Sequence, residues 1–333
     1  LLGFADELAP QPGPGGEADR EPVVPSFATA AVAAVTSERA GLQRVELDSG
    51  RRAYVLTELI GPVAVGDRVV VNTTAVDLGL GTGGWDVVHW NLSREGWSGP
   101  GGGHVMKLRY TSLQVDTGAA DDEATDLGGR PVVACDLHSQ LAAVAAAFDQ
   151  AAPHRRLTYV MTDSAALPLA LSDVVADLVR QGLLSETITC GQAFGGQREA
   201  VNLHSALVLA RGDAIVVAPG PGVVGTGSRL GFSGLEVATV VDAVARLGGR
   251  PIVAVRYSGA DARERHQGRS HHTGTALELA SHPALAPVPP EGWVGPDVGG
   301  VTTMGRTQAE DPEFFRYAGA AGLAAAQLLR DSS

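Results

Sequence analysis

The chain has 333 residues, a formal net charge of −12, 44% hydrophobic residues and 19% charged residues. This length favours two domains, and the apolar content supports a substantial core and excludes wholesale disorder. The acidic charge argues against nucleic-acid binding, the apolar runs are too short to span a membrane, and two cysteines cannot form a disulfide framework. We therefore expect a cytoplasmic protein.

The first part of the chain falls into a tail and a small domain. Residues 1–26 are dense in proline and glycine, which predicts a tail or linker. Residues 27–115 hold short β-branched runs separated by turn signals such as Gly66-Asp67, a pattern typical of a small antiparallel β-barrel or sandwich. We expect its strands at residues 31–35, 42–47, 52–56, 68–71 and 85–90.

Residues 116–130 are expected to form a linker, and from residue 131 the hydrophobic period changes. Apolar runs alternate with helical patterns, which predicts a doubly wound, mainly parallel α/β domain of the Rossmann-like kind over residues 131–333. The strands are expected at 132–135, 158–161, 187–190, 215–218 and 252–255, and the helices at 140–148, 171–183, 199–210, 234–247 and 312–329. The last helix is rich in alanine, which indicates close helix packing or a homo-oligomer.

A glycine-rich loop follows the fourth of these strands, where α/β proteins usually bind ligands. It matches Gly-x-Gly-x-x-Gly, but the next helix begins late and Arg256, not an acidic residue, follows the next strand. A dinucleotide site is therefore disfavoured, although a nucleotide stays open, and a Walker loop is excluded. The loop predicts either an anion cradle or a purely structural turn. The expected anion-binding residues are Gly220, Gly222, Gly225, Thr226, Gly227, Ser228, Gln192, Arg263 and Arg265.

Polar residues follow every predicted parallel strand, so they should converge on one edge of the sheet. Arginines and histidines gather after the fifth strand, which suits an anionic ligand. We expect Asp163, His266 and His271 to act as acid or base. A carboxylate–imidazole metal site is an alternative, with Asp136, His138 and His272 as the candidate ligands of a divalent metal. Adjacent His271 and His272 rarely face one point, so one of them is expected to be structural.

Five segments of the chain carry a specific pattern: GHVMKLRYT at 103–111, MTD at 161–163, TITCGQAFGG at 187–196, GPGVVGTG at 220–227 and RHQGRSHHT at 265–273. Together they resemble a bacterial family of unknown function, DUF3866. The resemblance runs from about residue 32 to residue 280, which is most of the chain. That family has no assigned reaction, so the resemblance implies no substrate, cofactor or site residue.

Three functions remain open from the sequence. The leading hypothesis is an enzyme that binds a small phosphorylated or otherwise anionic substrate at the sheet edge and acts by acid/base chemistry. The second is a metal-dependent hydrolase. The third is a non-catalytic sensor of a nucleotide or metabolite.

Overall fold

The computed structural model describes residues 25–99, 103 and 105–331. The chain divides into two compact units, one up to Gly101 and the other from Gly102 onward. The predicted tail at residues 1–26 lies almost entirely outside the described residues. Among the helices that are described, none is both long and apolar enough to cross a membrane.

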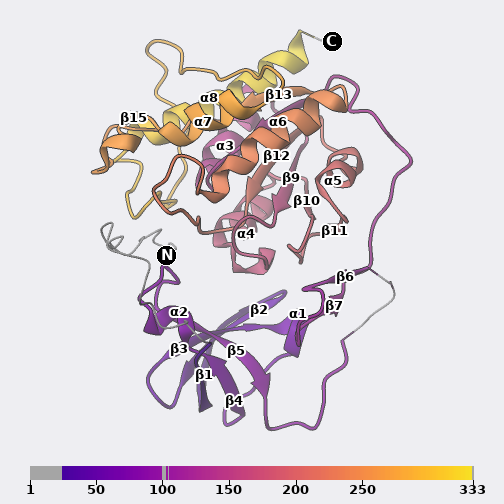
Figure 1. Cartoon of the computed structure of the whole chain (residues 1–333), viewed down its shortest axis with the longest axis vertical. Coiled ribbons are helices and arrows are strands. Elements are labelled where there is room, and N and C mark those ends of the chain that lie inside the picture. Colours follow the sequence, from indigo (N-terminus) through magenta and orange to yellow (C-terminus); the bar gives the residue numbers. More distant parts are fainter. Residues whose placement is uncertain (1–24, 100–102, 104, 332–333) are drawn as a thin grey trace. The chain divides into compact units, whose positions relative to one another are not determined.

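The first unit is a closed five-stranded barrel, which confirms the predicted N-terminal β-barrel (Figure 1). Its strands follow the order β1-β2-β3-β5-β4, and β1 also pairs with β4 to close the ring. Every pairing is antiparallel except that of β3 with β5. The elements are β1 (Phe27–Arg39), β2 (Leu42–Leu47), β3 (Arg52–Leu56), α1 (Thr57–Ile60), β4 (Arg68–Asn72), α2 (Thr74–Asp77) and β5 (Trp85–Asn91).

Alternating apolar residues fill the barrel. In β2, for example, Gln43, Val45 and Leu47 are buried, whereas Glu46 is exposed. Successive side chains of a strand point to opposite faces, which explains this alternation. β1 extends beyond the predicted 31–35 at both ends, because Phe27 and its neighbours pair with β4 and the residues up to Arg39 pair with β2.

The second unit contains the predicted parallel sheet with helices on both faces. Its six strands follow the order β11-β10-β9-β12-β8-β13, and each neighbouring pair is parallel. The strands are β8 (Pro131–Ala134), β9 (Leu157–Thr162), β10 (Glu186–Thr189), β11 (Arg198–Glu199), β12 (Ala214–Pro219) and β13 (Arg250–Val253). Four two-residue strands form small ribbons outside this sheet: β6 (Met106–Lys107) with β7 (Val115–Asp116), and β14 (Tyr257–Ser258) with β15 (Gly268–Arg269).

The helices cover the two faces according to the direction in which the chain moves across the sheet. The cluster of α3, α4 and α8 packs on one face, and that of α5, α6 and α7 on the other. Such an arrangement keeps the crossovers right-handed, because the chain moves from β8 toward the β11 edge and then returns to β12 and β13. The helices are α3 (Gln140–Ala151), η1 (Leu169–Leu171), α4 (Asp173–Arg180), α5 (Leu203–Leu209), η2 (Ser233–Leu235), α6 (Glu236–Arg246), η3 (Glu264–His266), α7 (His271–Leu279) and α8 (Pro312–Arg330).

Two helices differ from the sequence expectation. The helix expected at 199–210 begins at Leu203, because Asn202 and Ser205 form a capping box that sets its start. The segment after β13, expected as a polar loop, contains α7, which Ser270 caps by accepting a hydrogen bond from the His272 backbone. The alanines of α8 pack within the chain against α3, where Gly322 lies on the Val144 carbonyl. They therefore no longer argue for a homo-oligomer.

Residues 103–130 belong with the α/β unit, which differs from the predicted boundary near 115 and the predicted linker at 116–130. Lys107 is buried and its ammonium donates to Glu199 and to the Thr189 and Ala193 carbonyls. Leu127 is likewise buried in the core of this unit. The local composition of residues 103–130 resembles that of a loop, so it does not predict the contacts that Lys107 and Leu127 make with the α/β unit.

Candidate functional site

Two adjacent parallel strands, β8 and β13, bring the candidate residues together at the carboxyl edge of the sheet. Asp136 follows β8, and Arg256 follows β13. The chain then continues through η3 to the start of α7, where it presents His266, His271 and His272. Loops after parallel strands converge in this way because the strand ends share one edge.

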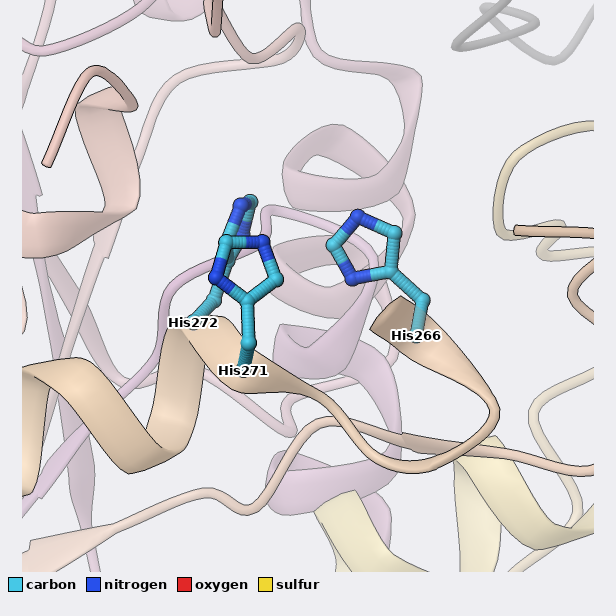
Figure 2. A group of neighbouring side chains, drawn as sticks. All are labelled: His266, His271 and His272. Atoms are coloured by element: carbon cyan, nitrogen blue, oxygen red, sulfur yellow. The ribbon is translucent and has the colours of Figure 1, made fainter. Parts of the chain in front are cut away.

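The three imidazoles form one cluster, and Figure 2 shows their rings turned toward one another. One ring nitrogen from each of His266, His271 and His272 lies within 4.8 Å of the others. Ser270 organises the cluster, because its hydroxyl bonds Nδ1 of His266 at 2.7 Å while capping α7. The two adjacent histidines share this cluster since they occupy the first turn of α7, where side chains lean toward the helix N-terminus. The expectation that only one of them faces the site is therefore wrong.

All three histidines are held in the neutral form. Burial, followed by the positive charge of Arg256, lowers the pKa of His266 to about 3 and that of His272 to about 2. Burial and the nearby arginines also lower the pKa of His271. Neutral imidazole keeps a nitrogen lone pair and is the form that binds metals. The Nε2 atom of His271 is buried and has no hydrogen-bond partner within the described residues.

Asp136 contributes a buried carboxylate to the same cluster. Its Oδ2 lies 3.8 Å from Nδ1 of His272, and neither carboxylate oxygen has a hydrogen-bond partner among the described residues. Burial raises the pKa of Asp136 to about 6, although the charge of Arg256 acts in the opposite direction. A buried carboxylate without hydrogen bonds is costly, and a bound cation removes that cost.

The surrounding side chains hold the cluster in place and give it a positive neighbour. The Phe232 ring stacks on His272 with 3.7 Å between centroids and 0° between planes. Arg256 Nη1 lies 3.0 Å from Nδ1 of His272. A cation that binds Nδ1 of His272 must displace the Arg256 guanidinium from this nitrogen. The displaced guanidinium then has the Asp136 carboxylate nearby as an alternative partner.

The donor set fits a zinc-like ion. Three neutral imidazoles with an open position for water are the ligand set of catalytic zinc sites, with bonds of about 2.0–2.1 Å. Tetrahedral ligands at that bond length lie about 3.4 Å apart, so the three nitrogens must draw together by roughly an ångström.

Comparison with known families matches residues 52–292 to the family model described as Protein of unknown function (DUF3866). The chain belongs to this family. A search of curated proteins finds none that matches significantly. The predicted resemblance is thus confirmed, and the DUF3866 match spans the β8 and β13 edge with its three histidines.

The two arginines expected to bind an anion differ in their surroundings. Arg263 makes a two-pronged ion pair with Asp261, at 2.9 and 2.8 Å, inside the polypeptide. Arg265 is exposed, and its guanidinium lies beside His266 and against Gly227. A Cβ at Gly227 would stand 3.0 Å from Nη1 of Arg265, so the glycine loop and the histidine cluster are neighbours.

Hydrogen bonds within the glycine loop close it on itself. The Thr226 and Ser228 hydroxyls lie 3.0 Å apart, and Ser228 also accepts from the Gly231 amide. Gly225 forms an isolated β-bridge with Phe232. These groups therefore build a tight turn, which favours the structural interpretation of the loop.

Two further glycines of this loop also have structural reasons. Gly220 lies so close to the Ala166 carbonyl that a Cβ could not fit. Gly222 has a φ of 88°, a left-handed conformation that glycine adopts readily. Both observations explain the glycines without an anion.

Asp163 and Gln192 lie along the same edge of the sheet, but they form hydrogen bonds with each other and with Arg109 and not with the histidine cluster. The exposed Asp163 carboxylate accepts a hydrogen bond from the backbone N–H of Gln192 at 2.8 Å. The side-chain oxygen of Gln192 in turn accepts a hydrogen bond from the backbone N–H of Arg109. They follow β9 and β10, and β12 separates β9 from β8. At about 4.8 Å per strand, this puts the end of β9 roughly 10 Å from the end of β8. Asp163 therefore is not part of the histidine cluster.

His138, a candidate metal ligand in the sequence, is not among the three histidines whose ring nitrogens lie together. Its Nδ1 bonds the Pro219 carbonyl at 2.9 Å, and its Nε2 bonds the Ser172 hydroxyl at 2.7 Å. Burial lowers the pKa of His138 to about 4, so the ring is neutral and fully hydrogen-bonded. It connects β12 to the cap of α4.

Sequence reasoning missed two residues that shape the site: Phe232 and Ser270. Ser270 could have been found, because a serine before an apolar helical pattern is a common N-cap. Phe232 has no local signal, since only the folded chain places it on His272.

Proposed function

We propose that this protein is a metal-dependent hydrolase that acts on a small phosphorylated or otherwise anionic substrate. The observation that carries the proposal is the cluster of three neutral histidines beside the unpartnered Asp136 carboxylate. Nitrogen ligands, an available carboxylate and a sheet-edge location are the ingredients of hydrolytic metal centres.

Each residue has a distinct role in this proposal. His266, His271 and His272 hold the ion, which when bound lowers the pKa of a water molecule toward 7. Asp136 accepts the proton of that water, a role that suits a carboxyl whose pKa is raised to about 6. Arg265, exposed beside His266, holds the anionic group of the substrate.

The free cysteines Cys135 and Cys190 support a reducing compartment such as the cytoplasm.

One observation favours a second candidate, an acid/base enzyme without a metal. Arg256 already occupies Nδ1 of His272, so a positive charge lies at the cluster without any ion. In that case His271 and Asp136 would exchange protons with a substrate held by Arg265.

Hydrolysis of p-nitrophenyl phosphate, measured with and without added Zn²⁺ or Mn²⁺, tests the proposal. We expect turnover that is lost after chelation, restored by the metal and abolished in His271→Ala. Turnover that survives chelation would replace the proposal with the metal-free enzyme. Stabilisation by phosphate without any turnover would contradict both enzymes and support the sensor.

A further inference from the structure

A second polar cluster lies on the same sheet edge, at the end of β9. Glu236, the first residue of α6, accepts hydrogen bonds from the Thr162 hydroxyl at 2.6 Å and from the Ser164 hydroxyl at 2.7 Å. None of these residues takes part in the histidine cluster. An acidic residue in the first turn of a helix is stabilised by the helix dipole, but that effect does not require two hydroxyl donors.

A short segment connects this cluster to the candidate metal centre. Phe232 stacks on His272, Gly234 lies against the Asp136 backbone, and Glu236 reaches the end of β9. The segment is largely helical, so the Cα atoms of Phe232 and Glu236 lie about 6–8 Å apart. Asp136 follows β8 and Glu236 contacts the end of β9, so the two carboxylates lie at the same edge of the sheet, about 10 Å apart across β12.

The two oxygens of Glu236 differ. Both hydroxyl donors bond Oε2, while Oε1 accepts no hydrogen bond from the described residues. The side chain is only partly buried, so it has access to solvent. Burial raises the pKa of Glu236, against the effect of the two hydroxyls. A carboxyl fixed through one oxygen and open at the other is suited to proton transfer.

We infer that Glu236 is the general acid that protonates the leaving group of the substrate, an inference that rests on the proposed hydrolase. Water attacks the phosphorus and gives one proton to Asp136. The bond from phosphorus to the leaving oxygen breaks, the electron pair goes to that oxygen, and Oε1 of Glu236 supplies its proton. Solvent then carries the proton of Asp136 back to Glu236, so the net change is the addition of one water molecule.

Two esters with different leaving groups test this role. Phenol has a pKa of about 10, as tyrosine does, and needs protonation, whereas p-nitrophenolate is a much weaker base. In Glu236→Gln, kcat/KM for phenyl phosphate should fall by about 100-fold, and that for p-nitrophenyl phosphate by less than about 5-fold. Ser164→Ala, which removes one of the two hydroxyls, should show the same selectivity with a smaller loss.

Glu313→Gln is the matched control, because Glu313 also lies in the first turn of a helix and pairs with Arg316. It should leave both esters unaffected. Equal losses on the two esters in Glu236→Gln and in Ser164→Ala, with metal content unchanged, would show a structural role and overturn the inference alone. Failure of the metal-loaded wild-type protein to hydrolyse either ester would instead overturn the proposed function.

Discussion

Oδ2 of Asp136 lies 3.8 Å from Nδ1 of His272, and no described residue donates a hydrogen bond to that carboxylate. The two residues are distant in sequence, and the pairing of β8 with β13 makes them neighbours. Their relationship turns a group of histidines into a candidate cation site, because it adds a buried negative charge that needs a partner.

Arg265→Gln should weaken the binding of anions. Arg265 is exposed beside His266, so its loss removes a charge-assisted contact without disturbing the core. We expect the apparent Kd for inorganic phosphate to rise about tenfold, corresponding to roughly 1.4 kcal/mol. Isothermal titration calorimetry provides the measurement. Arg180→Gln removes an exposed arginine of α4 that pairs with Asp177, and it should bind phosphate as the wild type does. Equal affinities for all three proteins would exclude Arg265 from the site.

The Asp261 ion pairs should stabilise the protein in a pH-dependent way. Burial opposes ionisation of Asp261, but the hydrogen bonds and charges of Arg263 and Arg306 outweigh it and lower its pKa. A lowered pKa gives stability that is present above the ordinary value of about 4 and is lost as the pH falls below it. Asp261→Asn should therefore lower the free energy of unfolding by about 2 kcal/mol at pH 7.

Urea unfolding at pH 7 and at pH 3 tests this sign. The difference between wild type and Asp261→Asn should shrink at the lower pH. A difference that grows as the pH falls would contradict the assignment of these ion pairs.

Much of this fold follows from sequence periodicity, because each strand and helix buries a face that its residues mark. The β8 strand is a continuous apolar run because both of its faces are covered: Val132 packs on one side of the sheet, and Val133 on the other. The sheet-edge location of Asp136 and the three histidines also follows from the strand–loop alternation. The sequence does not reveal which groups each side chain contacts. His138 and Asp163 have suitable side chains, but in the folded chain they form hydrogen bonds with residues of other loops.

Lys107 and Glu199 show the same limit and offer a stability test. Lys107 is 1% exposed and its side chain pairs with that of Glu199. Removal of one partner from a buried pair typically costs about 3–5 kcal/mol, because the other charge remains buried. Lys107→Met should unfold at correspondingly lower urea concentration, and the double variant Lys107→Met/Glu199→Gln should be more stable than Lys107→Met alone. A single variant as stable as the wild type would show that this pair does not anchor residues 103–116.

Two glycine substitutions should have opposite effects on stability. A Cβ at Gly322 of α8 would collide with the Val144 carbonyl of α3, so Gly322→Ala should destabilise the protein by about 1–3 kcal/mol. At Gly274 in α7 a Cβ meets nothing within 4 Å, so Gly274→Ala should stabilise it by about 0.5–1 kcal/mol. Thermal unfolding measures both. Stabilisation by Gly322→Ala would contradict the described packing of α8 on α3, and destabilisation by Gly274→Ala would contradict the open space at Gly274.

The stoichiometry and affinity of Zn²⁺ binding test the central claim most directly. Elemental analysis and calorimetric titration of the wild-type protein should find one ion per chain, and zinc at 100 times its Kd should stabilise the fold by about 2.7 kcal/mol. His271→Ala should weaken zinc binding by at least about 100-fold. His282→Ala, which removes a histidine that pairs with Asp242, should bind as the wild type does. Absence of stoichiometric zinc, or equal affinity in the two histidine variants, would contradict a metal centre at His266, His271 and His272.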